Sequence, residues 1–189
     1  MKHYLVALAI AGLSCSAWAD EPPGWGEFSV KSENAKFKAL VSVLGHKNKS
    51  QSWENRFRIQ VRTAESNGPA RAIWERPYDY DGYAGGILSN DGAYFMYVDF
   101  WYRDTTPAVR IYSQGTSCFL TGKQLGMKED SLEKTVSHRL WLNGEPKFVE
   151  LRGQSVAVIV PTVQGQKRIE LATDVPFDGL RCAPKIANY

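Results

Sequence analysis

Short segments of alternating apolar and polar residues, separated by turn-forming residues, fill most of this chain. The clearest example lies within residues 86–114, where an Asn90-Asp91-Gly92 turn leads into the long aromatic segment 93–103. Alternation with a period of two places successive side chains on opposite faces of a strand, and Asp-Gly turns join antiparallel strands. The sequence therefore predicts an all-β fold.

Three stretches of the chain follow the same plan of three or four antiparallel strands. The expected strands are 28–32, 37–44, 56–62 and 70–76, then 86–89, 93–103, 108–113 and 116–120, and finally 147–152, 155–163 and 167–173. The comparable turns lie near Asn34, Asp91 and Gly153, 57 and 62 residues apart, which we interpret as a repeat of about 60 residues. Three such units predict a small propeller-like, a prism-like or trefoil-like, or a sandwich arrangement.

Little helix is expected in this chain. One short helix is predicted near 121–134, where Leu125, Met127 and Leu132 lie among polar residues. The polar segment 45–55 predicts a surface loop. The tail, residues 174–189, is rich in Pro and Gly and predicts irregular structure.

Residues 88–98 read LSNDGAYFMYV. This segment resembles a blade of the TolB-like β-propellers, in which a Ser-x-Asp-Gly turn leads into an apolar strand. At the matching place the first unit has Ser-Glu-Asn at 32–34 and the third has Arg-Gly-Gln at 152–154, and both depart from the pattern. The resemblance implies a binding platform as often as an enzyme, so it implies no particular reaction.

The first 19 residues have the pattern of a secretory signal peptide. Lys2 precedes a short apolar core at 4–13, and Ala-Trp-Ala at 17–19 supplies small residues for cleavage before Asp20. The core is shorter than the roughly 20 residues of a membrane-spanning helix, and no later stretch is long and apolar enough to span. We therefore expect a periplasmic or secreted protein without a transmembrane segment.

Lipidation of Cys15 is the alternative to simple cleavage, although Gly12 stands where lipoprotein signals have a bulky aliphatic residue. Cleavage at Ala19-Asp20 leaves a single β-rich domain, residues 20–189, of ordinary size. The leader holds one of the 23 basic residues and none of the 20 acidic ones, which leaves a net charge of +2. So small an imbalance does not favour nucleic acid or an anionic membrane as partner.

Two cysteines, Cys118 and Cys182, remain after cleavage. An even pair in an exported chain predicts a disulfide. Closing a loop of roughly 65 residues would stabilise the fold by about 4 kcal/mol in the chain-entropy model. The alternative is a catalytic thiol at Cys118 with His138 as its base, although residues 115–118 match no nucleophile motif.

The two remaining histidines predict no metal site. His46 lies in a polar loop, and His138 alternates with Val136 and Leu140, which favours a half-buried structural role. No third ligand accompanies them at metal spacing, so we predict neither a metal nor another cofactor. A catalytic His138 would need to face a pocket with a carboxylate or hydroxyl within reach.

Aromatic and acidic residues gather in two segments that form a candidate binding surface. The first lies within 78–83, and the second is one face of segment 93–103. Their candidate residues are Tyr78, Asp79, Tyr80, Asp81 and Tyr83, and Tyr97, Asp99 and Trp101. Tyr and Trp suit recognition surfaces because they bury much area with little loss of entropy. The alternatives are a Tyr-rich loop with Asx turns, and a two-sided core strand with Asp99 hydrogen-bonded to the backbone or an arginine.

The acidic residues of the first segment also invite two more specific interpretations. Asp79 and Asp81 could start a calcium loop, but the later acidic residue of an EF-hand is missing. As a glycosidase pair they would have to lie about 5 Å or more apart across a cleft. On another strand, Arg56, Arg58 and Arg62 point away from the apolar side, which suits either solvent or an acidic partner or anionic polymer.

The sequence favours an exported, non-catalytic envelope protein that binds or inhibits another protein through the aromatic and acidic surface. The alternative is a carbohydrate-binding module or glycoside-acting enzyme that uses aromatic stacking and carboxylates. The expected partner is a protein, or else a saccharide, and not a nucleic acid.

Overall fold

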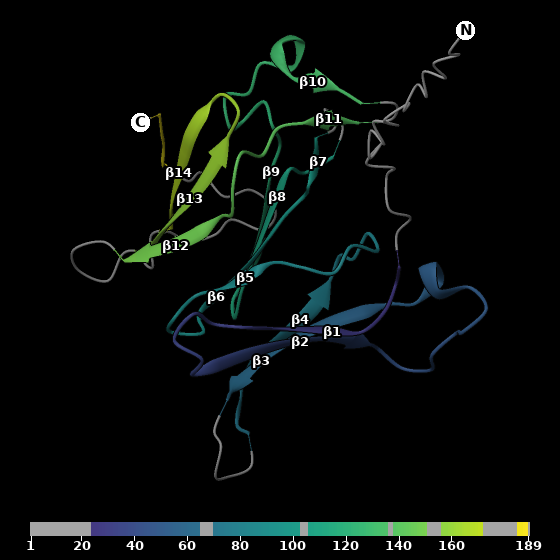
Figure 1. The fold of residues 1–189 in the computed structure, drawn as a ribbon. Coiled ribbons are helices and arrows are strands. Elements are labelled where there is room, and N and C mark those ends of the chain that lie inside the picture. Colours follow the sequence, from purple (N-terminus) through teal and green to yellow (C-terminus); the bar gives the residue numbers. More distant parts are fainter. Residues whose placement is uncertain are drawn as a thin grey trace, which may run out of the picture.

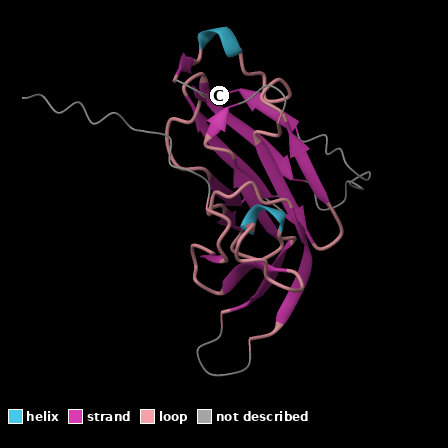
Figure 2. Ribbon diagram, turned by 90° about the vertical axis from the view of Figure 1, so that its right-hand side faces the viewer, coloured by secondary structure: helices cyan, strands magenta, loops and turns pink. Residues whose placement is uncertain are grey.

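The structure is a computed structural model that describes residues 24–64, 70–102, 106–135, 138–150 and 156–171, and the backbone of 185–188. The expected signal peptide, the turn at Gly153 and Cys182 lie outside these residues. Within them the fold is all-β, as predicted, with four antiparallel sheets. Helix is confined to two single 3-10 turns, and the rest is strand and loop (Figure 2).

Three of the sheets are four-stranded meanders. The first contains β1 Phe28–Lys31, β2 Phe37–Val43, β3 Phe57–Thr63 and β4 Ala72–Tyr78. The second contains β5 Ile87–Leu88, β6 Tyr94–Val98, β8 Val109–Ser113 and β9 Ser117–Leu120. The third contains β12 Lys147–Glu150, β13 Val156–Thr162, β14 Gly165–Leu171 and β15 Lys185–Asn188. In each meander the strands pair in their order along the chain.

The second sheet lies between the first and the third (Figure 1). Along β6, Tyr94 and Met96 belong to a core shared with β13 and β14, whereas Phe95 and Tyr97 belong to a core shared with the first sheet. The middle sheet therefore buries both of its faces, and each face belongs to a different hydrophobic core.

The single long strand expected at 93–103 is wrong, because the chain leaves the second sheet after β6. Asp99 Oδ1 accepts the backbone N–H of Trp101 at 2.9 Å, and Asp99 O accepts Nε1 of the buried Trp141 at 2.7 Å. The chain then enters β7 Trp101–Tyr102. This strand pairs with β11 Arg139–Leu140, and β10 Glu133–Lys134 completes a small fourth sheet.

Three further expectations need correction or refinement. The helix predicted near 121–134 is only a 3-10 turn, η2 Glu129–Ser131, and a similar turn, η1 Ser52–Glu54, lies in the predicted loop 45–55. The tail is not irregular throughout, since β15 pairs with β14. Strand β4 continues through Pro77, which β4 tolerates as an edge strand because the missing N–H faces away from the ladder.

The turns that open the first two meanders are built alike. In each, a serine hydroxyl accepts the backbone N–H of the residue five positions later, at 3.1 and 2.9 Å, and donates to the side chain two positions later, at 2.8 and 2.6 Å. The residues are Ser32, Asn34 and Phe37 in the first turn, and Ser89, Asp91 and Tyr94 in the second. The third comparable turn is not described, so a threefold repeat stays a prediction.

The two turns also bind each other. Asn34 donates from its backbone N–H to Asn90 Oδ1 at 2.9 Å and from its side chain to Asn90 O at 2.8 Å. Beside them Gly92 has a φ of 71°, and its carbonyl accepts Nε1 of Trp74 at 2.7 Å. A Cβ at Gly92 would lie 2.7 Å from the ring of Phe37. The first and second sheets are therefore aligned by this turn pair.

Substitution Gly92→Ala should lower the free energy of unfolding by about 2–5 kcal/mol. Left-handed backbone costs a non-glycine residue about 1–2 kcal/mol, and overpacking against Phe37 adds about 1–3 kcal/mol. Gly115→Ala is the matched control, because a Cβ there meets no atom within 4 Å. Urea unfolding measures both variants, and equal stability of the two would contradict the role of the turn pair.

Candidate functional site

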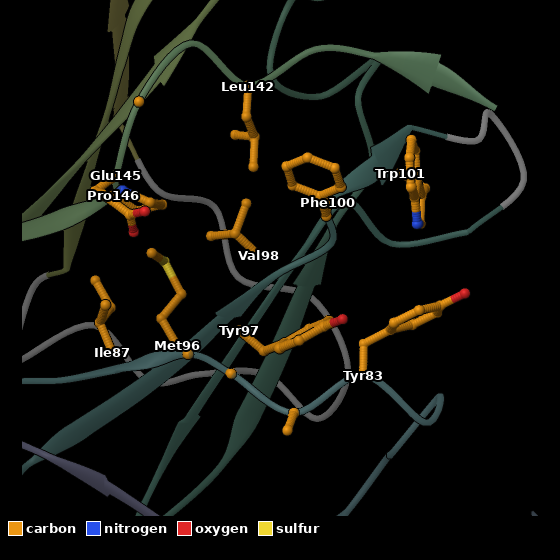
Figure 3. Close-up of a pocket in the computed structure, with 14 residues that line it drawn as sticks. Tyr83, Ile87, Met96, Tyr97, Val98, Phe100, Trp101, Leu142, Glu145 and Pro146 are labelled. Atoms are coloured by element: carbon orange, nitrogen blue, oxygen red, sulfur yellow. The ribbon is translucent and has the colours of Figure 1, made fainter. Parts of the chain in front are cut away.

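A pocket of about 600 Å³ opens between the second sheet and residues 142–146. Its lining includes apolar side chains and aromatic rings together with one carboxylate; these are Ile87, Met96, Val98, Leu142 and Pro146, the rings of Tyr83, Tyr97, Phe100 and Trp101, and Glu145. Figure 3 shows the apolar side chains on one side and Tyr83, Tyr97 and Trp101 on the other. The volume falls within the usual range for ligand pockets, about 300–1,000 Å³.

One wall of the pocket depends on bare backbone at residues 85–86. Gly86 has a φ of 116°, and a Cβ there would collide with the ring of Phe95 and the carbonyl of Met96. Glycine is the residue that tolerates both the positive φ and the close approach. The segment that carries Tyr83 can therefore run directly into β5 beside β6.

Arg110 of β8 is the one arginine buried in the cores of the described residues, and it lies next to this pocket. Its Nη1 is 2.9 Å from Asp81 Oδ2, its Nε is 3.8 Å from Asp79 Oδ2, and its guanidinium lies 5.4 Å from the centre of the Tyr97 ring. Burial is the largest single influence and lowers the pKa of Arg110, but the interactions with Asp81, Tyr112 and Asp79 together outweigh it, so that the pKa is raised. The guanidinium stays charged and holds Asp81 against β6 and β8.

The segment 79–83 is further attached at two points. The backbone N–H of Asp79 donates to the Tyr112 hydroxyl at 3.3 Å, and the Tyr80 hydroxyl donates to Gly24 O at 3.1 Å. With Asp81 bound to Arg110, the whole segment is fixed to the sheets below it. This arrangement places the Tyr83 ring at the pocket.

Aromatic stacking fixes the opposite side of the pocket. Trp101 stacks on His138 with ring centres 4.8 Å apart and an angle of 26°. Phe100 meets Trp101 edge to face at 4.8 Å and is 50% exposed. Because one face of Trp101 is covered by His138, Phe100 is the most exposed aromatic ring of the lining.

Three of the eight predicted binding residues, Tyr83, Tyr97 and Trp101, line this one pocket. Asp81 adjoins it through Arg110 and through a hydrogen bond with Tyr97. The side chain of Asp79 is 70% exposed. The structure thus brings together half of the predicted set around one pocket.

The remaining predicted residues serve the fold. Tyr78 is 5% exposed because it pairs with Phe57 on the inner face of the first sheet, and Tyr80 packs edge to face on Phe57. Asp99 is 8% exposed and hydrogen-bonded to the backbone of Trp101. Tyr78 and Asp99 are therefore buried, and Asp99 makes the backbone hydrogen bond that the core-strand alternative gave it.

The catalytic alternatives gain no support from the geometry. Asp79 and Asp81 both approach the same guanidinium and do not flank a cleft. Cys118 is 1% exposed within the core of the second and third sheets, so its sulfur is out of reach of a substrate. Its disulfide with Cys182 stays a prediction. In the described part of the chain no three His, Cys, Asp or Glu residues are grouped so that they could hold a metal ion.

Sequence reasoning missed Arg110, Phe100 and Glu145. The signal for Arg110 was present, since an arginine on a strand packed on both sides needs a carboxylate partner. Phe100 falls on the face of the expected strand 93–103 that is opposite Tyr97 and Trp101, and after the break at Asp99 it is half exposed. Glu145 lies in a connecting segment, and only the fold brings it to the second sheet.

No family model, curated protein or solved structure matches this chain. Within the described ranges, the structure has no helix of the length and apolar character that crossing a membrane requires. The function must therefore be argued from the site itself.

Stability should fall at high pH because three core tyrosines resist ionisation. Burial raises the pKa of Tyr78, Tyr97 and Tyr112, and neighbouring Tyr or Asp charges raise it further. Above about pH 10 the unfolded chain releases these protons and the folded chain retains them. The free energy of unfolding then decreases by about 1.4 kcal/mol per pH unit for each such tyrosine.

Urea unfolding between pH 9 and 11 measures this slope. Tyr97→Phe should reduce the loss of stability between pH 9 and pH 11 by about 1.4 kcal/mol in total, because it removes one such proton and the unfolded tyrosine ionises around pH 10. An unchanged slope in the variant would contradict the burial of the Tyr97 hydroxyl.

Proposed function

We propose that this protein is an exported, non-catalytic binding protein that holds or inhibits another protein of the cell envelope. The observation that supports this most is the pocket of about 600 Å³, where apolar side chains and four aromatic rings, among them the half-exposed Phe100, meet beside a single carboxylate. Aromatic anchors in such pockets dominate the affinity of protein interfaces.

The titratable groups of the pocket argue for binding and against catalysis. Tyr97, whose pKa is raised by burial, cannot act as a base near neutral pH. Glu145 lines the pocket as its one carboxylate. General acid–base chemistry needs positioned groups with a pKa near the working pH, usually an acid and a base together.

The lining favours a protein segment over a sugar. A saccharide needs carboxylates or amides that are available for its hydroxyls, but Asp81 is bound to Arg110 and Asp99 to the backbone. An apolar or aromatic side chain of a partner fits among Met96, Val98 and Phe100. A basic residue beside it would meet Glu145.

The envelope location rests on the leader at 1–19 and on the predicted Cys118–Cys182 disulfide. Both are expectations from the sequence, and the burial of Cys118 is compatible with a disulfide. An oxidising compartment is where such a bond would form.

Affinity capture from an envelope fraction, followed by titration of the captured protein, tests the proposal. Phe100→Ala should weaken binding at least about 10-fold, since a central aromatic anchor contributes more than 1 kcal/mol. The matched control is Trp53→Ala, because Trp53 is 58% exposed and does not line the pocket. The control should bind within about 2-fold of the parent protein.

Two results would contradict this function. One is a captured protein whose affinity is equally insensitive to Phe100→Ala and Trp53→Ala. The other is saturable binding of a soluble oligosaccharide that Phe100→Ala abolishes, which would favour the carbohydrate-binding alternative.

A further inference from the structure

The outer face of the first sheet carries a row of cations that the fold itself does not explain. Lys31 of β1 pairs directly with Lys38 of β2, and Lys38 pairs directly with Arg62 of β3. Directly opposed residues on one face of a sheet have Cβ atoms about 4.5–5.5 Å apart, and like charges at that distance destabilise the pairing. Three neighbouring strands therefore maintain an unfavourable arrangement.

None of the ion pairs among the described residues involves Lys31, Lys38 or Arg62. In addition, Nε of Arg62 is buried and has no hydrogen-bond partner. The acid nearest in the register is Glu75, and it is already bound to Arg58 at 3.5 Å and to Gln60 at 2.9 Å. The positive charge of the row is thus uncompensated within the described molecule.

A shallow hollow of about 360 Å³ adjoins this row on the same face. Its polar lining includes the side chains of Ser29, Ser42, Arg58, Gln60 and Arg62, and Leu40 lies among them. Glu27 also lines the hollow, and its carboxylate is 3.8 Å from Lys47 and accepts the backbone N–H of Val43 at 3.0 Å. Serine hydroxyls and guanidinium groups are the donors that bind phosphate oxygens. Of the two β3 arginines in this lining, Arg58 is already bound to Glu75, whereas Nε of Arg62 has no hydrogen-bond partner, so Arg62 is the guanidinium that suits a phosphate group.

Apolar side chains share this face. Leu40 belongs to neither core, and Leu44, which continues the alternation of β2, is 48% exposed. The backbone N–H of Leu44 donates to Arg56 O at 2.7 Å, so the pairing of β2 with β3 extends to this position. A surface that combines Lys and Arg with the exposed Leu44 and the half-buried Leu40 has the character of proteins that lie on anionic lipid.

We propose that the outer face of the first sheet docks on an anionic phospholipid surface, with lipid phosphates at Lys38 and Arg62. The proposal is independent of the pocket function, because this face shares no residue with the pocket. The small net charge of the chain does not reveal this basic face, because acidic residues elsewhere in the chain cancel its positive charges in the sum. Among the described residues, no other sheet packs on the outer face of the first sheet (Figure 1).

Co-sedimentation with vesicles tests the proposal. The purified protein should bind vesicles of phosphatidylcholine and phosphatidylglycerol at 3:1, should not bind phosphatidylcholine alone, and should dissociate at high salt. The double variant K38Q/R62Q should bind about 30-fold more weakly, because each basic residue near an anionic surface contributes about one factor of five. Its thermal stability should be equal to or higher than that of the parent, because the two substitutions remove the repulsion between directly opposed positive charges.

The matched control is K128Q/K134Q, which removes the same charge at two exposed lysines near β10, far from the first sheet (Figure 1). It should bind vesicles like the parent protein. The proposal fails if anionic vesicles do not bind, if K38Q/R62Q binds normally, or if the control weakens binding equally. Binding of poly-glutamate without binding of anionic vesicles would also overturn it, in favour of an acidic protein partner.

Discussion

The structure depends on a middle sheet that must bury both of its faces. Alternation along β6 sends Tyr94 and Met96 to one core and Phe95 and Tyr97 to the other. A one-residue slip in the pairing of β6 would exchange these two sets, so the register must be strongly determined. The turn between β5 and β6, in which the Ser89 hydroxyl accepts the backbone N–H of Tyr94 and donates to Asp91, is one device that determines it.

Beside Tyr97, in the core that the middle sheet shares with the first sheet, β8 carries Arg110 in place of an apolar residue. Its charge requires a carboxylate, and Asp81 supplies it from the segment that follows β4. The same ion pair fixes Tyr83 beside Tyr97, so that a requirement of the core also determines the pocket. Fold and candidate site are thus connected through one buried cation.

Much of the architecture could be predicted because strands and turns leave local signals. The alternation of 56–62 and 93–98 predicted β3 and β6, and the two faces of β6 followed from parity. The break at Asp99 could not be predicted, because it depends on Trp141, 42 residues away. Strand β15 could not be predicted for the same reason: it forms by pairing with β14, and its own Pro- and Gly-rich surroundings predicted irregular structure.

The site was only partly predictable for the same reason. Tyr83, Tyr97 and Trp101 belong to aromatic segments that are evident in the sequence. Leu142 and Glu145 lie far along the chain, in the connection between β11 and β12, and only the fold brings them to the pocket. The cation row on the first sheet needed the register between β1, β2 and β3, which the sequence does not contain. Composition, with its small net charge, indicated no basic face at all.

A double-mutant cycle between Arg110→Met and Asp81→Asn tests the connection between core and pocket most directly. Breaking a buried ion pair costs about 3–5 kcal/mol, and the side chain of Asp81 is 28% exposed, so we expect a smaller coupling of about 2 kcal/mol in the free energy of unfolding. Arg58→Met with Glu75→Gln, an exposed pair, should couple by less than about 1 kcal/mol. Additive effects of Arg110→Met and Asp81→Asn would contradict the account.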